Sequence, residues 1–354
     1  MSRIKTLQRK LNEHNLDALL ITSDVNRAYL TGFTGTAGMA VIGRDQAWLL
    51  TDFRYMEQAA EQVKECKIIE HKQSIYDSVS TILKLIGAEK LGFEKESVTY
   101  SQYELIQKYL NVTPVPTNGI VEKLRMIKTS AELEVMQEAA RIADDAFIHI
   151  QSYIKPGVKE IDVANELEFF MRRAGATSSS FDIIVASGHR SALPHGVASD
   201  KVIQTGELVT LDYGAIYNGY CSDITRTFAV GDISEKLTDI YETVLAAQLL
   251  GVEGTKPGLT GSEADALTRN HINNKGYGAY FGHSTGHGLG MEVHEGPALS
   301  PRSSQILEPG MVVTVEPGIY IPNVGGCRIE DDIVITQTGN YRLTKSTKEL
   351  IHLS

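Results

Sequence analysis

Two carboxylates lie on a segment whose sequence predicts a tight β-hairpin. Residues 207–230 read ELVTLDYGAIYNGYCSDITRTFAV, and the central Asn218-Gly219 pair is the strongest short-range signal for a two-residue type I′ turn. With that turn, Asp212 faces Thr225, and Asp223 points to the same side of the sheet as Thr225. Diagonal cross-strand neighbours are about 7–8 Å apart at the backbone, which suits two metal ions roughly 3.5–4 Å apart. The alternative is a solvated hairpin with two surface aspartates.

Sequence echoes indicate that this hairpin belongs to an internal repeat. The tripeptide Lys-Pro-Gly precedes a predicted helix at residue 155 and again at residue 256. The run Gly206–Asp212 parallels Gly310–Glu316, and each run ends on an acidic residue. A second acid follows in each half, at Asp223 and at Glu330, so that the three offsets are 101, 104 and 107 residues. Two helix–helix–strand–strand units that face each other would bring these four carboxylates to one central cleft.

A histidine adds a nitrogen ligand to this oxygen-rich set. His287 lies in the glycine-rich run GHSTGHGLG, where the missing side chains leave room for an imidazole and a ligand. A lone histidine is more often structural, but four candidate carboxylates favour coordination here. Four acids and one neutral histidine suit Mn²⁺, Co²⁺ or Zn²⁺, and two such ions would lower the pKa of a shared water. Without metal, the converging anions predict a destabilised protein or raised carboxyl pKa values.

Further polar residues surround this set. His195 precedes the hairpin and His294 follows the candidate ligand histidine by seven residues, so that either could hydrogen-bond a substrate carbonyl or a developing oxyanion. We interpret His283 as structural. Arg328 shares strand parity with Glu330 and is therefore expected in the same cleft, where it would hold a substrate carboxylate or pair with acidic neighbours to orient them.

The elements that position these residues predict two domains and an α+β fold. Residues 1–122 alternate helix and strand patterns, which is typical of a small α/β domain with a mixed sheet. Residues 123–354 form the second domain, which contains the repeat and a long helix that begins with a capping box at Thr129 and Glu132. The proline-rich stretch Val112–Gly119 is interpreted as the boundary region.

Composition excludes several classes of protein. The chain has 354 residues, a formal net charge of −10 and a pI near 5.5, which argue against a nucleic-acid or anionic-membrane surface. No apolar run approaches the roughly 20 residues of a membrane helix, and the N-terminus lacks a secretory signal. Cys66, Cys221 and Cys327 are odd in number and far apart, which indicates a reducing cytoplasm.

With these residues in place, the chain resembles the metallopeptidases of the pita-bread fold, in the branch of Xaa-Pro dipeptidase (prolidase) and aminopeptidase P. The likeness covers the whole chain and rests on the motifs PHG, DYG, DITRT, GHGLGMEVHE, EPGIY and CRIEDD. The first domain is similar to the creatinase-type N-terminal domain of that branch, which methionine aminopeptidase normally lacks. The resemblance implies a C-terminal pita-bread domain with a pseudo-twofold repeat.

The resemblance also implies roles for single residues. Two divalent ions per subunit, with Mn²⁺ favoured over Co²⁺ and Zn²⁺, would be held by Asp212, Asp223, His287, Glu316 and Glu330. Asp223 and Glu330 would bridge the ions, and Glu316 would also move a proton. His195 and His294 would position and polarise the scissile bond, and Arg328 would help to hold the substrate. Thr225 is expected as an outer partner of Asp212.

The implied reaction is hydrolysis of the peptide bond before proline, with Xaa-Pro dipeptides or short Xaa-Pro peptides as substrates and a homodimer as the assembly. The compact length favours the dipeptidase, and aminopeptidase P, which acts on longer Xaa-Pro peptides, is the alternative. The metal-free creatinase branch and a non-catalytic pita-bread binding module are disfavoured because all five ligand positions are present.

Overall fold

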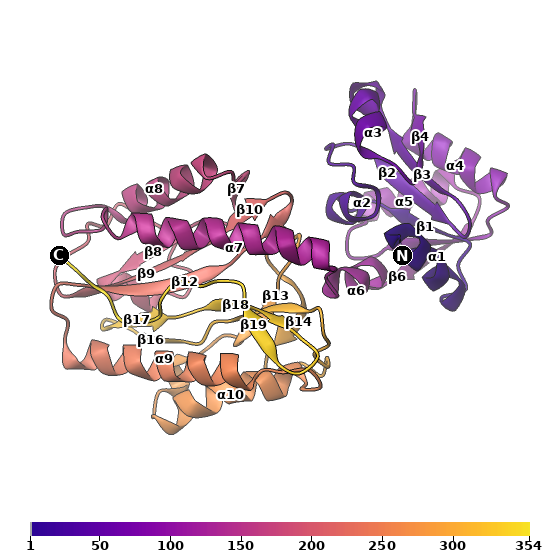
Figure 1. Cartoon of the computed structure of the whole chain (residues 1–354). Coiled ribbons are helices and arrows are strands. Elements are labelled where there is room, and N and C mark those ends of the chain that lie inside the picture. Colours follow the sequence, from indigo (N-terminus) through magenta and orange to yellow (C-terminus); the bar gives the residue numbers. More distant parts are fainter. Residues whose placement is uncertain (1) are drawn as a thin grey trace. The chain divides into compact units, whose positions relative to one another are not determined.

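The protein, described here by a computed structural model over residues 2–354, divides into two compact units. The first unit ends at Arg125, and the second spans Met126–Ser354 (Figure 1). Among the described residues, no helix combines the length and the apolar character that a bilayer crossing requires.

The first unit is a mixed sheet with helices, as the sequence predicts. Over residues 2–125 the strand order is β4-β3-β2-β1-β5-β6, in which β1 runs antiparallel to β2 and parallel to β5. The strands are β1 (Ala18–Ile21), β2 (Met39–Gly43), β3 (Ala47–Thr51), β4 (Lys67–Glu70), β5 (Lys90–Glu94) and β6 (Thr113–Thr117). The helices are α1 (Arg3–Glu13), α2 (Asp24–Thr31), α3 (Met56–Gln62), α4 (Ile75–Leu85), α5 (Tyr100–Tyr109) and α6 (Ile120–Met126).

The proline-rich stretch is part of this sheet. Residues 113–117 form β6, which pairs in parallel with β5 at the edge of the sheet. Proline lacks a backbone donor, and an edge strand tolerates it because one side of the strand needs no partner. The stretch that the sequence suggested as a boundary region is therefore an edge strand of the first unit.

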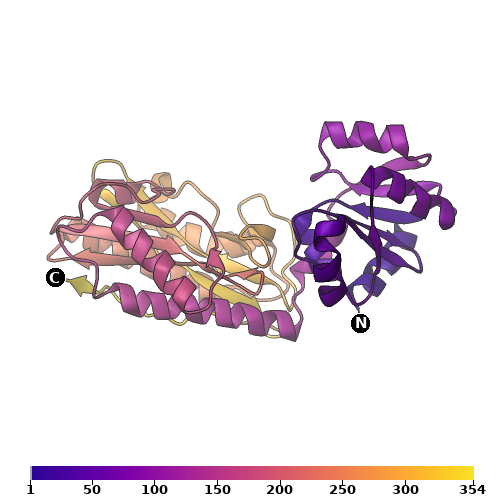
Figure 2. The same ribbon diagram turned by 90° about the horizontal axis from the view of Figure 1, so that it is seen from above.

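In the second unit, strands lie between two pairs of helices (Figures 1 and 2). The helices are α7 (Ser130–Ile150), α8 (Glu160–Arg173), α9 (Glu235–Gly254) and α10 (Gly261–Asn274). The strands of the first half are β7 (Ser178–Ser179), β8 (Ile184–Ser187), β9 (Glu207–Tyr213), β10 (Ala215–Tyr217), β11 (Tyr220–Cys221) and β12 (Ile224–Val230). The later strands are β13 (Gly286–Gly288), β14 (Glu295–Leu299), β15 (Val312–Val315), β16 (Gly318–Ile321), β17 (Gly325–Arg328), β18 (Asp331–Ile335), β19 (Asn340–Arg342) and β20 (His352–Leu353).

The predicted repeat is visible in the backbone pairing. Neighbouring strands follow the order β12-β9-β8 in the first half and β18-β15-β13 in the second. The Lys-Pro-Gly turns also match, because Gly157 donates its N–H to Ile203 O and Gly258 donates its N–H to Leu307 O. Each turn leads into the second helix of its half. The two halves of the unit therefore repeat one helix–helix–strand–strand arrangement.

The hairpin has the predicted register. Asp212 pairs with Thr225 in the β9–β12 ladder, and Tyr217 pairs with Tyr220 next to the turn. Asn218 has φ 46° and Gly219 has φ 80°, as a type I′ turn requires at both central positions. The register places Asp212 and Asp223 on one side of the sheet.

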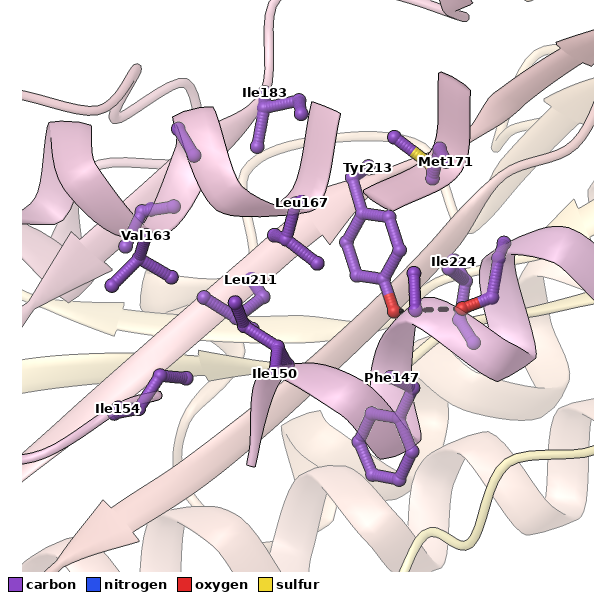
Figure 3. Packing of buried hydrophobic residues seen from close by; sticks show 14 of the residues in the cluster. Phe147, Ile150, Ile154, Val163, Leu167, Met171, Ile183, Leu211, Tyr213 and Ile224 are labelled. Atoms are coloured by element: carbon purple, nitrogen blue, oxygen red, sulfur yellow. Dashed lines mark hydrogen bonds between the residues drawn. The ribbon is translucent and has the colours of Figure 1, made fainter. Parts of the chain in front are cut away.

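The opposite side of the same strands is buried in the core beneath α7 and α8 (Figure 3). Tyr213, which is fully buried, packs there and donates its hydroxyl hydrogen to Ala143 O at 3.0 Å. Phe147 and Phe228 stack in the same cluster with ring centroids 5.2 Å apart. Because side chains alternate along a strand, anchoring Tyr213 in the core holds the neighbouring Asp212 toward the other face.

Candidate metal centre and active site

One cavity of about 530 Å³ in the second unit gathers the residues that the sequence singled out. Its wall includes all eight of the predicted site residues, namely His195, Asp212, Asp223, His287, His294, Glu316, Arg328 and Glu330. The remaining wall is partly apolar, with Phe181, Ile184 and Val197 among its residues. The cavity can therefore combine charged chemistry with an apolar substrate side chain.

The four carboxylates lie at or next to the ends of strands. In the first half, Asp212 lies near the end of β9 and Asp223 directly precedes β12. In the second half, Glu316 directly follows β15 and Glu330 directly precedes β18. The repeat thus places one pair of acids from each half on the same cavity, as the sequence echoes predict.

The glycines around His287 serve the neighbouring backbone. A Cβ atom on Gly286 would lie 2.0 Å from Thr314 O, and one on Gly288 would lie 2.1 Å from Gly296 O. Larger residues at either position would push the adjacent chain segments away from the strand. The sequence suggested that these glycines leave room for the imidazole, whereas the structure gives close backbone approach as the physical reason.

The imidazole of His287 presents Nε2 to two carboxylates. Nε2 lies 3.7 Å from Asp223 Oδ2 and 3.3 Å from Glu316 Oε1. Nδ1 lies 3.0 Å from Gly288 O, which favours the tautomer that carries its hydrogen on Nδ1 and leaves the Nε2 lone pair free. Ligand atoms of Asp223, His287 and Glu330 all lie within 4.8 Å of one another. This spacing suits a single cation.

The electrostatics of the cavity call for positive charge. Burial, together with the charges of Glu330 and Asp212, raises the pKa of Asp223 well above its usual range. Burial and the charges of Glu316 and Asp212 likewise raise the pKa of Glu330, and burial raises the pKa of Glu316 to about 8. Among the residues that the structure describes, Asp212 Oδ1 and Asp223 Oδ1 are buried without a hydrogen-bond partner. Divalent cations would satisfy these oxygens and relieve the repulsion.

Two outer contacts orient the carboxylates. Thr225 Oγ1 donates to Glu330 Oε2 at 2.6 Å. The hydroxyl that was expected to bond Asp212 therefore bonds a carboxylate from the other half of the repeat. Asp332, which was not among the residues predicted from the sequence, accepts the backbone N–H of Asp223 at 2.9 Å. A signal for Asp332 was present, because it follows Glu330 by two residues in the motif CRIEDD.

The guanidinium group of Arg328 donates hydrogen bonds to other groups of the protein. Its side chain is 3% exposed; Nη2 contacts Asp212 and Nε donates to Thr225 Oγ1 at 3.1 Å. Nη1 donates to Pro194 O at 3.1 Å and to Tyr320 Oη at 2.7 Å. Of the two roles open from the sequence, these contacts support the one in which Arg328 orients an acidic neighbour.

Three histidines lie around the charged centre. His195 and His294 are exposed, and the ring of His294 stands at 4.4 Å from that of His287 in an edge-on arrangement. His283, interpreted from the sequence as structural, lines the cavity and has Nε2 at 2.9 Å from the hydroxyl of Tyr320. Burial lowers the pKa of His283 to about 4, so its imidazole is neutral at physiological pH.

Comparisons with known proteins agree with this geometry. Residues 134–337 match the model of metallopeptidase family M24, and residues 3–127 match the creatinase/prolidase N-terminal domain. The chain is 43% identical to a Xaa-Pro dipeptidase of Pyrococcus furiosus over 99% of both chains. A solved Xaa-Pro dipeptidase from Bacillus anthracis superposes with a TM-score of 0.98 at 59% identity, covering 99% of both chains. A solved X-Pro aminopeptidase from Thermotoga maritima superposes with a TM-score of 0.92 at 36% identity, covering 98% of this chain and 100% of that one.

The chain belongs to metallopeptidase family M24. Its fold is a creatinase-type N-terminal domain followed by a pita-bread catalytic domain, and its activity class is metal-dependent peptide hydrolysis. Both statements agree with the expectations drawn from the sequence motifs.

Proposed function

We propose that this protein is a Xaa-Pro dipeptidase that uses two divalent metal ions to hydrolyse the peptide bond before proline. The observation that carries the proposal is the meeting of four carboxylates and one histidine on a single cavity, with buried carboxylate oxygens left unpaired. The names of the relatives at 43% and 59% identity support the dipeptidase over the alternative. Aminopeptidase P is the second candidate, supported by the likeness to the Thermotoga enzyme.

The proposed ligands are those that line the cavity in pairs from the two halves. Asp212 would help to hold one ion and His287 with Glu316 the other, and Asp223 and Glu330 would be shared between the two. When bound, the ions would supply an activated water and polarise the substrate carbonyl. The donor set fits them, because carboxylate oxygens and one neutral imidazole suit hard and borderline divalent ions. Among the three candidate metals we propose Mn²⁺, to which this oxygen-rich set is well matched.

The chain's own residues then handle the proton and the substrate. Glu316, which lines the cavity, accepts a proton from the attacking water and delivers it to the departing proline nitrogen. His195 and His294 stand exposed at the same cavity and donate hydrogen bonds to the substrate carbonyl as negative charge develops on its oxygen. Arg328 bonds both Asp212 and Pro194 O, and it thereby fixes the position of this carboxylate relative to the loop that carries His195.

An Arg328→Lys variant separates the two roles of this residue. A lysine keeps the charge but cannot bond Asp212, Tyr320 and Pro194 together, since it lacks the planar fork of donors. We expect metal affinity to fall about 10- to 100-fold, as for other lost outer partners of metal ligands, with KM unchanged once metal is saturating. Metal titration and Xaa-Pro kinetics give this result. A raised KM at full metal occupancy would instead support a role in binding the substrate carboxylate.

Three wider properties are part of the proposal. The cysteines Cys66, Cys221 and Cys327 are free thiols, which supports a cytoplasmic location. The family resemblance supports a homodimer, which light scattering on the purified protein would test. We assign the catalytic chemistry to the second domain, predicted over residues 123–354, and the N-terminal domain to residues 1–122.

The decisive substrate test compares Ala-Pro with Ala-Pro-Ala on Mn²⁺-loaded protein. We expect cleavage of the dipeptide and little release of alanine from the tripeptide, measured by chromatography of the products. Efficient cleavage of the tripeptide would move the assignment to aminopeptidase P. If neither peptide is cut with Mn²⁺, Co²⁺ or Zn²⁺, the hydrolytic proposal fails and a binding module of the same fold replaces it.

A further inference from the structure

The loop over residues 193–199 carries His195 to the cavity without a bond to its ring. His195 is exposed, and among the described residues no hydrogen bond reaches its imidazole nitrogens. The loop is tied inside itself, since Gly196 donates its N–H to Leu193 O and Val197 donates its N–H to His195 O. The main chain of this loop therefore determines where the imidazole stands.

A buried carboxylate forms hydrogen bonds to the end of this loop. Glu160, the first residue of α8, has a fully buried side chain. Its Oε2 accepts from Ser199 Oγ at 2.6 Å, from Ser199 N at 3.3 Å and from Arg190 Nε at 2.9 Å. Its Oε1 accepts from the backbone N–H and the hydroxyl of Ser187, both at 2.8 Å. One side chain thus joins the end of β8, the segment before the loop and the end of the loop.

Arg190 extends this connection toward His195. It lies in the 3₁₀ turn η2 (Gly188–Ala192), and its Nη2 donates to Val197 O at 2.6 Å, two residues beyond His195. The ion pair with Glu160 is largely removed from water, since the side chains are 18% and 0% exposed. A buried charge that loses its partner is costly, so each member of the pair depends on the other.

The second half of the repeat has no counterpart of this carboxylate. In the second half of the repeat the equivalent helix begins at Gly261, whose N–H binds Gln305 O as that of Glu160 binds Lys201 O. A Cβ on Gly261 would lie 2.1 Å from Ala298 O, so the second half accommodates no side chain there. A backbone hydrogen bond ties the first residue of the helix in both halves, and the carboxylate is an addition in the half that contains His195.

We infer that Glu160 and Arg190 are positioning residues, which fix the 193–199 loop so that His195 meets the substrate carbonyl. The inference rests on the proposed function and adds two residues to it. Neither residue lines the cavity, so both act through the loop. A displacement of a positioned group by about 1 Å can cost on the order of a hundredfold in rate, so a loosened loop should be visible in kcat.

The test uses Glu160→Gln and the milder Arg190→Lys in metal-loaded protein. The glutamine would turn an amide donor toward donors that now face a carboxylate, and the lysine would keep the charge but lose the bond to Val197 O. We expect kcat on Ala-Pro to fall about tenfold or more for the first variant and about threefold for the second, with metal content unchanged. Hydrogen exchange of the loop amides is expected to accelerate in both variants.

A double-mutant cycle with His195→Ala gives a readout that a general loss of stability would not move. If the pair acts through His195, Glu160→Gln is expected to change kcat less than about twofold when His195 is already absent. The matched control is Asp144→Asn, because Asp144 is a buried carboxylate that accepts from Lys345 N and from Ser346 N, away from this loop. The control is expected to keep wild-type kinetics.

Three outcomes would overturn the inference, and a fourth would remove the proposed function on which it rests. Equal losses from Glu160→Gln in the presence and absence of His195 would overturn the inference, as would wild-type kinetics for both variants. A loss in the control as large as that in Glu160→Gln would reduce the effect to ordinary destabilisation and overturn it too. Wild-type protein that leaves Xaa-Pro peptides intact would remove the proposed function, and the inference with it, whatever the loop amides do.

Discussion

Alanine in place of Asp223 or of Glu330 is expected to abolish peptide hydrolysis while the protein remains folded. Each carboxylate lies at the meeting of the two halves, where ligand atoms of Asp223, His287 and Glu330 approach within 4.8 Å. Loss of an outer partner of a metal ligand typically costs about 10- to 100-fold, and loss of a shared ligand is expected to cost more than about a hundredfold. Metal content by mass spectrometry and kcat with Ala-Pro would be measured together.

The same substitutions are expected to leave the metal-free protein at least as stable as the wild type. Asp223 and Glu330 are buried among other carboxylates, and burial and mutual repulsion raise the pKa of both. Removing either one removes a group whose charged form the surroundings disfavour. Thermal unfolding of metal-free samples checks this, with Asp144→Asn as a buried carboxylate outside the cluster.

Two results would contradict this account of the ligands. Full turnover by a metal-loaded Asp223→Ala or Glu330→Ala variant would exclude a shared-ligand role for that residue. A metal-free variant that unfolds well below the metal-free wild type would mean that the carboxylate stabilises the fold by itself. The second result would leave the catalytic assignment standing but would remove the electrostatic argument for it.

Metal removal is expected to have the second large effect, on stability. The metal ions bind the folded cavity and not the dispersed ligands of the unfolded chain, so saturation by about a thousandfold over Kd adds about 4 kcal/mol per site. For a domain of this size that corresponds to roughly 8–16 °C in Tm. Differential scanning calorimetry of protein with Mn²⁺ and of protein stripped by chelator measures the shift. Identical transitions would exclude a metal site coupled to folding.

The metal-free protein is further expected to lose stability as pH rises from about 6.5 to 8. Burial raises the pKa of Glu316 to about 8, and the pKa values of Asp223 and Glu330 are raised as well. The folded state therefore binds more protons than the unfolded state in this range of pH. Their contribution to stability is present at low pH and is lost as pH rises through the folded pKa. Histidines with lowered pKa values, such as His283, act in the opposite direction, but only below about pH 6.5, where an unfolded histidine takes up a proton.

A matched pair of proteins isolates this pH effect. Metal-free Glu316→Gln lacks the titrating group and is expected to show a flatter dependence of Tm on pH between 6.5 and 8 than the wild type. Equal slopes for the two proteins would contradict a raised pKa at Glu316. With metal bound, the carboxylates are held charged by the ions, and the dependence is expected to reverse because protons then compete with metal.

Local signals in the sequence were sufficient to select the proposed ligands and to predict the strand register of the hairpin. Asn218-Gly219 permits a turn with positive φ at both positions, and the ladder from Tyr217 to Asp212 follows from that turn alone. The echoes between the two halves predicted that Glu316 and Glu330 meet the hairpin acids, because equal units joined in tandem present equivalent strand ends. The side on which each acid lies follows from the two-residue period of a strand.

Side-chain partners that come from distant segments could not be read in this way. Thr225 was expected to serve Asp212, its cross-strand neighbour, but its hydroxyl reaches Glu330, 105 residues away in sequence. The choice between two roles for Arg328 likewise depended on the approach of Pro194 O and Tyr320. A side chain often has several polar groups within reach, and local sequence patterns do not indicate which of them will be its hydrogen-bond partner.

By itself, the sequence of this protein indicated the chemistry of the site: which residues to propose as metal ligands, near which strands they lie, and that two similar halves oppose each other. Those properties depend on short-range periodicity, turn preferences and ligand type, all of which act within a few residues. Only the tertiary structure decided how the site is supported, by Asp332 behind Asp223 and by Glu160 with Arg190 behind His195. Such supports form where the packing of separate elements buries polar groups that must then find partners, and that outcome depends on the whole fold.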